Sequence, residues 1–347
     1  MNNKRLYGIL PDGSKSHIYT IRSSAMKARV IDFGCVLTNL YVRDRQGRMI
    51  DVVLGYKNLE NYLVNGGNLG ATIAPNANRT KNARFMIDDQ LYQLEVNNGP
   101  NNLHSSVLHG AQKRLWSLVE LKENSVTLKL DLADGENGFP GQRQLWVTYS
   151  IEEQTTLQIR YEFISDKKTA FNPTNHTYFN LGGHASGNVL KHRLQLHCHY
   201  YTPVAAGSIP TGEIAPVKDT PMDFTEMKAV GRDLNGEFDQ FAITGGYDHN
   251  FVIDDYDGQM RECAVLECEK TGIRMRTFTD LPGVQFYSAN YLHFPNGKRN
   301  VFYDYRNAVC LETQYFPDSL NQPNFQKPVV EANKKVQTVT RYQFELI

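Results

Sequence analysis

The chain has 347 residues, of which 37 are Lys or Arg and 37 are Asp or Glu, so its formal net charge at pH 7 is zero. A chain with balanced charge lacks the basic field that holds a phosphate backbone, and we therefore expect no nucleic-acid partner. Charged residues make up 21% and hydrophobic residues 41%, a composition typical of a folded globular protein and not of a disordered one.

The sequence predicts neither a signal peptide nor a membrane-spanning helix. Residues 1–15, MNNKRLYGILPDGSK, contain no apolar stretch of signal-peptide length. No apolar run approaches the roughly 18 residues of a membrane-spanning helix. The cysteines are odd in number and widely spaced, which is typical of reduced thiols: Cys35, Cys198, Cys263, Cys268 and Cys310. We therefore expect a cytoplasmic protein without a membrane segment.

Alternation of apolar and polar residues with a period of two is the dominant pattern of the chain, and it is typical of strands with one buried face. Two-residue or short polar turns interrupt the pattern and predict hairpins. In chain order, we predict hairpins over 36–56, 83–96, 144–163 and 263–278, a further strand over 126–134, and late strands over 284–289, 309–314 and 339–346.

Helical periodicity is confined to short stretches such as residues 225–234, TEMKAVGRDL, which are long enough for two turns. Many short strands joined by turns favour an antiparallel sandwich over a fold with parallel strands and crossover helices. No segment has the composition of a linker, and no internal repeat is visible. The prediction is an all-β fold, a large antiparallel β-sandwich with few short helices, formed as one domain over residues 1–347.

Six polar segments are unlike ordinary turns because they are rich in Asn, His, Gln and Tyr. Their amide, imidazole and carboxylate groups suit bidentate hydrogen bonding to hydroxyl groups. Mounted on a rigid sandwich, such a set predicts a sugar-binding site. The most prominent polar residues of these segments are Asn76, Asn78, Arg79, His104, His109, Asn175, His176, Tyr178, Asp248, Gln285 and Glu312.

Taken one at a time, these residues also have ordinary structural interpretations. Glu312 fits an exposed carboxylate on an edge strand. His176 and His104 fit structural histidines held by hydrogen bonds. Asp248 fits the closing residue of an Asx turn, and Arg79 fits a solvated surface arginine.

Metal and cofactor signals are weak. His197 and His199 flank Cys198 on a predicted strand and would supply half of a metal site, but no third ligand is recognisable. The chain has no phosphate-binding Gly-rich loop, no Ser nucleophile elbow and no His-Glu-x-x-His helix. We therefore expect neither a metal nor a cofactor, and an acid/base set of histidines and carboxylates remains.

Four of the polar segments, in this order, resemble the aldose 1-epimerase (galactose mutarotase) family: NPTNHTYFNLGG, GYDHNFVI, LPGVQFYSANYL and LETQYFPDSLNQPNF. The resemblance extends over nearly the whole chain. It implies a large antiparallel β-sandwich with a sugar site in a surface groove. It also implies cofactor-free interconversion of the α and β anomers of a free hexose such as glucose or galactose, so that the partner is a monosaccharide.

Carried over residue by residue, the resemblance implies that Glu312 is the general base and His176 the general acid. His104 becomes the second active-site histidine, with His109 as a weaker competitor for that place. The residues implied to bind the sugar are Asn78, Arg79, His104, Tyr178, Asp248 and Gln285.

Two loops beside the expected sugar depart from the family pattern. Ala74-Pro75 stand where the family usually has Gly-Arg, and Ser105-Ser106 stand where it usually has Gly-Gly, so the preferred aldose stays open. For the acid/base pair, we expect burial to raise the pKa of Glu312 and a nearby carboxylate to keep His176 protonated.

Two other functions remain as alternatives. A glycoside hydrolase would use Glu312 and Asp248 as carboxylates roughly 5–9.5 Å apart, but it would leave the histidines without a purpose. A non-catalytic sugar-binding module on the same sandwich is the second alternative, since fold does not fix function. The presence of both His176 and Glu312 argues against it.

Overall fold

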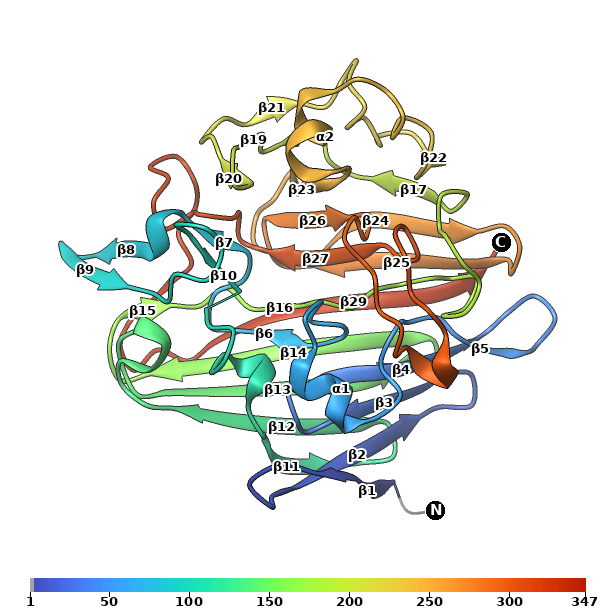
Figure 1. Cartoon of the computed structure of the whole chain (residues 1–347), viewed down its shortest axis with the longest axis horizontal. Helices are drawn as coiled ribbons and strands as arrows, with labels where there is room; N and C mark the ends of the chain where they lie inside the picture. Colours follow the sequence, from blue (N-terminus) through green and yellow to red (C-terminus); the bar gives the residue numbers. More distant parts are fainter. Residues whose placement is uncertain (1–2) are drawn as a thin grey trace.

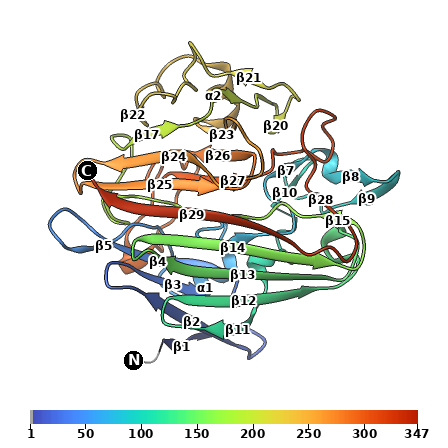
Figure 2. The same cartoon turned by 180° about the vertical axis from the view of Figure 1, so that it is seen from behind.

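The computed structural model describes residues 3–347, which form mainly antiparallel strands in three larger sheets and several two-stranded ribbons (Figures 1 and 2). The largest sheet has nine strands, in the order β11 (Ser117–Leu121), β12 (Ser125–Leu132), β13 (Arg143–Glu152), β14 (Thr156–Ser165), β29 (Val336–Leu346), β25 (Ile273–Thr279), β24 (Arg261–Cys268), β17 (Arg193–Leu196) and β22 (Lys228–Ala229).

Two five-stranded sheets face the nine-stranded one. The first follows chain order: β1 (Lys4–Ile9), β2 (Lys15–Arg22), β3 (Lys27–Ile31), β4 (Val36–Arg43) and β5 (Met49–Asp51). The second has the order β21 (Ala215–Pro216), β18 (Tyr200–Tyr201), β23 (Asp248–Val252), β26 (Gly283–Tyr287) and β27 (Cys310–Gln314). The nine-stranded sheet lies behind them in Figure 1 and in front in Figure 2, so the layers form a sandwich.

Short paired strands connect and cover these layers. They are β7 (Arg79–Thr80) with β10 (Asn102–Leu103), β6 (Thr72–Ile73) with β16 (Thr174–Asn175), β8 (Arg84–Ile87) with β9 (Gln90–Gln93), β15 (Thr169–Ala170) with β28 (Val329–Val330), and β19 (Val204–Ala205) with β20 (Ile209–Pro210). The helical segments are brief: α1 (Leu59–Val64), α2 (Asp239–Thr244) and four 3-10 turns at Lys81–Ala83, Ala111–Lys113, Glu136–Gly138 and Lys298–Asn300.

One large apolar cluster lies between the layers. It contains residues from all three large sheets, among them Val30, Ile159 and Phe286. Along β14 the apolar residues alternate with partly exposed polar ones, so a single face of the strand enters the cluster. Burial of this face is the main reason that the predicted alternation becomes a strand in the structure.

The predicted fold class is confirmed, and so are the four hairpins, which appear as the antiparallel pairs β4–β5, β8–β9, β13–β14 and β24–β25. Residues 225–234, the stretch with helical periodicity, contain no helix. Lys228 and Ala229 pair with β17 at the edge of the nine-stranded sheet instead. Tertiary pairing here outweighs the weak local helical preference of the segment. Among residues 3–347, no helix combines the length and the apolar character needed to cross a membrane.

Candidate active site

Strand register brings distant segments of the chain to one place. In the sheet of β23, β26 and β27, Asp248 is paired with Tyr287, and Tyr287 with Cys310. Gln285 of β26 is paired with Glu312 of β27. Because residues two apart on a strand share a face, one face of the sheet presents these polar side chains together. The short strand β16 lies against β27 and carries the chain directly into His176.

Glu312 and His176 face each other. Oε1 of Glu312 lies 3.7 Å from Nε2 of His176. Although β27 is an edge strand, Glu312 is only 3% exposed, so the interpretation as a solvent-facing carboxylate is wrong. Its other oxygen, Oε2, is buried and has no hydrogen-bond partner among the residues that the structure describes. Burial, and secondly the Asp248 carboxylate, raise the pKa of Glu312 well above its usual range, as expected.

His176 is held on several sides. Its ring stacks on Tyr178, with the ring centroids 4.9 Å apart, and its Nδ1 lies 3.7 Å from Sγ of Cys310. Its backbone N–H donates to the carbonyl of Ala71. Burial lowers the pKa of His176 to about 4. Our expectation that a nearby carboxylate keeps His176 protonated is therefore wrong, because burial disfavours the imidazolium and also raises the pKa of the neighbouring Glu312.

His104 packs edge-on against His176, with ring centroids 5.4 Å apart. Its Nδ1 accepts a hydrogen bond of 3.0 Å from the backbone N–H of Asn78, which assigns the proton of the neutral ring to Nε2. Burial, followed by the charges of His176 and Arg79, lowers the pKa of His104 well below its usual value. His104 is therefore a neutral hydrogen-bond donor. His109, the competitor for this place, is exposed and does not line the cavity.

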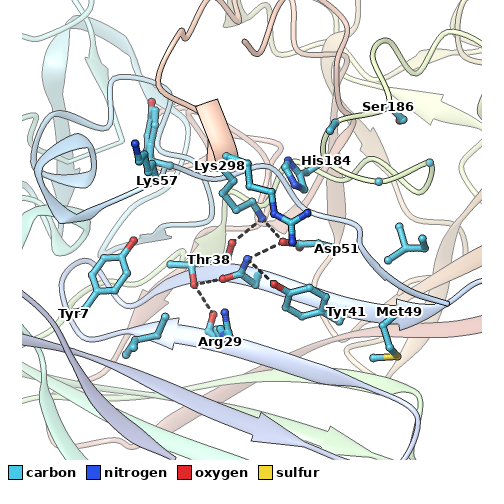
Figure 3. A pocket seen from close by; sticks show the side chains of 18 of the residues that line it. Tyr7, Arg29, Thr38, Tyr41, Met49, Asp51, Lys57, His184, Ser186 and Lys298 are labelled. Carbon is cyan, nitrogen blue, oxygen red and sulfur yellow. Dashed lines mark hydrogen bonds and ion pairs between the residues drawn. The ribbon is translucent and has the colours of Figure 1, made fainter. Parts of the chain in front are cut away.

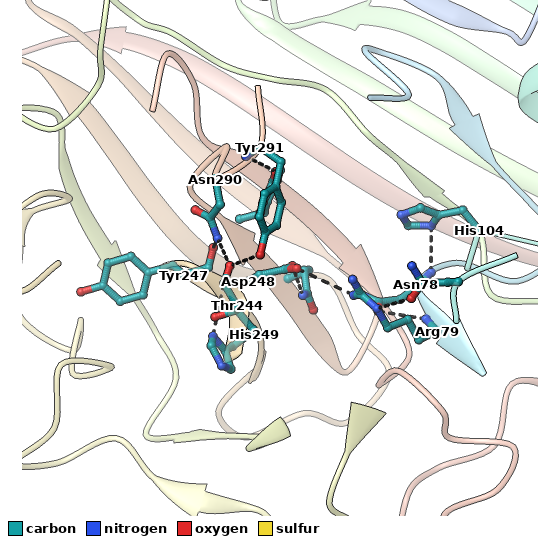
Figure 4. Close-up of polar contacts among 12 residues, drawn as sticks. Asn78, Arg79, His104, Thr244, Tyr247, Asp248, His249, Asn290 and Tyr291 are labelled. Atoms are coloured by element: carbon teal, nitrogen blue, oxygen red, sulfur yellow. Dashed lines mark hydrogen bonds and ion pairs between the residues drawn. The ribbon is translucent and has the colours of Figure 1, made fainter. Parts of the chain in front are cut away.

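Arg79 and Asp248 come from opposite sides of the site and face each other in Figure 4. Nη1 of Arg79 lies 3.7 Å from Oδ2 of Asp248. Gln285 lies behind Asp248 instead of lining the cavity. Its Nε2 donates to Oδ1 of Asp248 at 2.7 Å, and its Oε1 accepts from Gln314 at 3.2 Å. Gln285 thus fixes the orientation of the Asp248 carboxylate.

Ser105, in one of the two loops that depart from the family pattern, has a structural role. Ser105 Oγ accepts from the N–H of Asn76 and donates to the carbonyl of Asn76, both at 3.1 Å. Ser105 has a φ of 60°, in the left-handed region that glycine adopts most easily. Its hydroxyl therefore ties together the two loops that carry Asn78 and His104.

A cavity of about 200 Å³ lies between the predicted site residues. Those that line it are Asn78, Arg79, His104, His176, Tyr178, Asp248 and Glu312. Several lining residues have no counterpart in the sequence prediction: Gly66, Gly67, Asn68, Leu103, Tyr287, Tyr291, Leu292 and Phe294. Tyr287 was within reach, since it follows Gln285 by two residues on a predicted strand and so shares its face. Leu103 lies in β10, and the remaining residues lie on loops whose position depends on packing against distant segments.

His104, His176 and Glu312 also lie close enough together to hold a metal ion, since one donor atom of each lies within 4.8 Å of the others. However, Nδ1 of His104 accepts the hydrogen bond from Asn78, and its Nε2 carries the proton. This tautomer has no free lone pair for a metal ion. The set is therefore better suited to proton transfer and hydrogen bonding than to metal coordination.

Comparison with known proteins gives matches over nearly the whole chain. The family model described as aldose 1-epimerase matches residues 17–343. Galactose mutarotase of Homo sapiens is 35% identical over 345 residues, which cover 99% of this chain and 98% of the human protein. Aldose 1-epimerase of Escherichia coli (strain K12) is 30% identical over 339 residues, which cover 97% of both chains.

Solved structures give the same result for the fold. The aldose epimerase homologue from C. elegans superposes with a TM-score of 0.88 at 26% identity, covering 96% of this chain and 99% of that one. Galactose 1-epimerase from Lactobacillus acidophilus superposes with a TM-score of 0.86 at 25% identity, covering 99% of this chain and 98% of that one.

Proposed function

The chain belongs to the aldose 1-epimerase family, and on this premise we propose that it interconverts the α and β anomers of a free hexose, with Glu312 as general base and His176 as general acid. One observation carries the assignment of the two residues. The buried oxygen Oε2 of Glu312 lacks a partner among the described residues, and Nε2 of His176 lies beside the same carboxylate in the cavity. A buried acceptor without a partner is costly, and a sugar hydroxyl would satisfy it.

The reaction needs two proton transfers and no redox step. Glu312 takes the proton of the C1 hydroxyl while His176 gives a proton to the ring oxygen, and the C1–O5 bond breaks to leave an open-chain aldehyde. Rotation about C1–C2 exposes the other face of the carbonyl. Glu312 then returns its proton to the carbonyl oxygen as the C5 oxygen attacks C1 and gives its proton to His176. Each group acts as acid in one direction and as base in the other.

The pair needs only one shared proton for this cycle. Burial raises the pKa of Glu312 and lowers that of His176 to about 4, so without a sugar the proton is favoured on the carboxyl group. Protonated Glu312 with neutral His176 is the charge state that accompanies the open-chain aldehyde. The ring-opening state, with carboxylate and imidazolium, has the same total charge. Turnover therefore moves a proton within the site and requires no exchange with solvent.

The remaining residues bind and orient the sugar in this proposal. Arg79 and Asp248 hold ring hydroxyls from opposite sides, and His104 donates a hydrogen bond from Nε2. Tyr178 acts on the other side of His176: its ring stacks on the imidazole, and its hydroxyl donates to the carbonyl of Gly67. Its stacking fixes the plane in which His176 delivers its proton.

Two further parts of the proposal concern the whole chain. We propose that residues 1–347 form one domain, which is supported by an apolar cluster that runs from Tyr19 to Phe344. We also propose a cytoplasmic location, which is supported by five free and buried cysteines, since a reducing compartment preserves thiols.

The experiment that tests the function is polarimetry on freshly dissolved α-galactose and α-glucose. We expect the protein to accelerate the approach to the anomeric equilibrium, with no change in the total amount of hexose. A matched assay with nitrophenyl glycosides tests the hydrolase alternative, because a glycoside hydrolase would release reducing sugar from them and a mutarotase would not. A protein that binds galactose without accelerating mutarotation would be a binding module, and the proposed function would be wrong.

A further inference from the structure

A second groove, larger than the catalytic cavity, lies on the sheet of β1 to β5. Its volume is about 910 Å³, and its lining includes residues of these strands, of the loop at residues 182–186 and of the turn Lys298–Asn300 (Figure 3). It shares no lining residue with the cavity that contains Glu312. The groove is therefore a separate candidate for ligand binding.

The charge of this groove is strongly unbalanced, although the whole chain is neutral. A single carboxylate, that of Asp51, lines it together with six cationic side chains: Arg5, Arg29, Lys57, Lys270, Lys298 and Arg299. Several like charges around one concave surface raise the local potential and concentrate ions of the opposite sign.

The lone carboxylate is already engaged. Oδ2 of Asp51 accepts from Nζ of Lys298 and from Nδ2 of Asn39, both at 2.7 Å, and Oδ1 accepts from the N–H of Leu40 at 3.1 Å. Lys298 also donates to the carbonyls of Thr38 and Val53, so all three of its N–H donors are used. Asp51 therefore neutralises Lys298 and leaves the other cations of the groove uncompensated.

The other five cations have no ion-pair partner within residues 3–347, whereas Lys298 is paired with Asp51. Nε of Arg29 is buried and has no hydrogen-bond partner in the described part of the chain. Arg29 and Arg299 are near enough to Lys298 that their charges, after burial, help to lower the pKa of Lys298. An anion in the groove would relieve this repulsion and supply the acceptor that Nε of Arg29 lacks.

We propose that this groove binds a small organic phosphate, with Arg29, Lys57 and Arg299 as the groups that contact the phosphate. Guanidinium and ammonium groups are the usual protein ligands of phosphate oxygens. The volume exceeds what inorganic phosphate fills and lies in the range of small-molecule sites, roughly 300–1,000 Å³. The rest of the lining suits an organic portion, because it combines phenol rings with apolar side chains: Leu6, Tyr7, Ile18, Tyr41, Met49, Ile50 and Tyr56.

The test is titration calorimetry of the full chain with ATP, with glucose 6-phosphate and with inorganic phosphate as three separate probes. We expect at least one organic phosphate to bind with 1:1 stoichiometry and a Kd below about 1 mM, and to bind more tightly than inorganic phosphate. Added NaCl should weaken the binding because the contacts are ionic. Galactose should not compete, since the two cavities share no residue.

The variant pair K57E/R299E should weaken binding by about tenfold or more, since it replaces two attractive charges by repulsive ones. Its matched control is K218E/K334E, which changes the net charge equally at two exposed lysines outside the groove and should bind within about twofold of wild type. Circular dichroism of both variants reports correct folding, so a failure of the proposed enzymatic function leaves the binding result unaffected.

Three results would overturn the proposal. The first is an absence of saturable binding for all three probes. The second is an equal loss of affinity in the control pair, which would indicate a non-specific charge effect. The third is competition by galactose, which would locate the phosphate at Arg79 in the catalytic cavity.

Discussion

The backbone N–H of Asn78 donates a hydrogen bond of 3.0 Å to Nδ1 of His104. This contact determines which nitrogen of a buried, neutral imidazole carries the proton, and it leaves Nε2 as a donor. The two residues lie 26 positions apart, on loops joined by the short pair β7–β10. A backbone group thus sets the hydrogen-bonding character of a side chain beside the acid/base pair.

A first prediction follows from this tautomer. His104→Asn keeps an acceptor near the position of Nδ1 but removes the donor, whereas His104→Gln places an amide N–H near the position of Nε2. We expect His104→Asn to lower kcat/KM by roughly 10- to 100-fold, because one hydrogen bond to a buried polar group is worth about 1–3 kcal/mol. His104→Gln should retain more activity. Steady-state polarimetry on both variants makes the comparison, and equal losses would contradict the assigned tautomer.

A second prediction concerns the base. Glu312→Gln preserves the shape of the side chain but removes its ability to take a proton, so kcat should fall by about 10²- to 10⁴-fold. The matched control is Glu267→Gln, which changes the same chemical group at another buried position, where Glu267 bonds Arg274. The control should keep nearly full mutarotation. Retention of activity by Glu312→Gln would refute the assignment of the base.

The same variant gives a prediction on stability. Burial raises the folded-state pKa of Glu312 above its ordinary value of 4.5, so above that pH the folded state holds a proton that the unfolded state has lost. The contribution of this group to the free energy of unfolding therefore declines as pH rises through the folded-state pKa. Denaturant unfolding at pH 5 and pH 8 should show Glu312→Gln gaining stability relative to wild type at the higher pH. A relative loss at pH 8 would contradict the raised pKa.

A third prediction is the pH dependence of kcat/KM. In its active state the pair of Glu312 and His176 shares one proton. Activity therefore falls at low pH, when His176 is protonated while Glu312 keeps its own proton, and at high pH, when Glu312 loses the shared proton. Because burial lowers the pKa of His176 to about 4, the acid limb should lie well below the ordinary histidine value near 6.5. Both limbs belong to the pair as a unit. An acid limb centred near pH 6.5 would show that His176 is not desolvated as described.

A fourth prediction separates positioning from direct sugar contact. Gln285 donates to Asp248 and lies behind it, so Gln285→Leu should raise KM through a misplaced Asp248 carboxylate. Asp248→Ala should raise KM by a larger factor. If Gln285 acts only through Asp248, the double variant should resemble Asp248→Ala alone, because residues that share one interaction are not additive. Additive effects in this double-mutant cycle would indicate an independent contact between Gln285 and the sugar.

The sequence predicted the strands well because alternation is a local property. Along β14 buried and partly exposed side chains alternate from Leu157 to Phe163, and this pattern of burial follows from the residues themselves. The segment at 225–234 shows the limit of local reasoning. Its helical preference is weak, and Lys228 pairs with Leu194 of β17, which no local pattern reveals.

For the site, four short motifs that resemble the family implied the roles of His176, Glu312 and Asp248. Only the tertiary structure decided the states of these groups. The pKa of His176 depends on how completely distant strands exclude water, and the role of Gln285 depends on the register between β23 and β26. Desolvation and cross-strand hydrogen bonds arise between residues far apart in the chain, so their strength is fixed by packing and not by the neighbouring letters of the sequence.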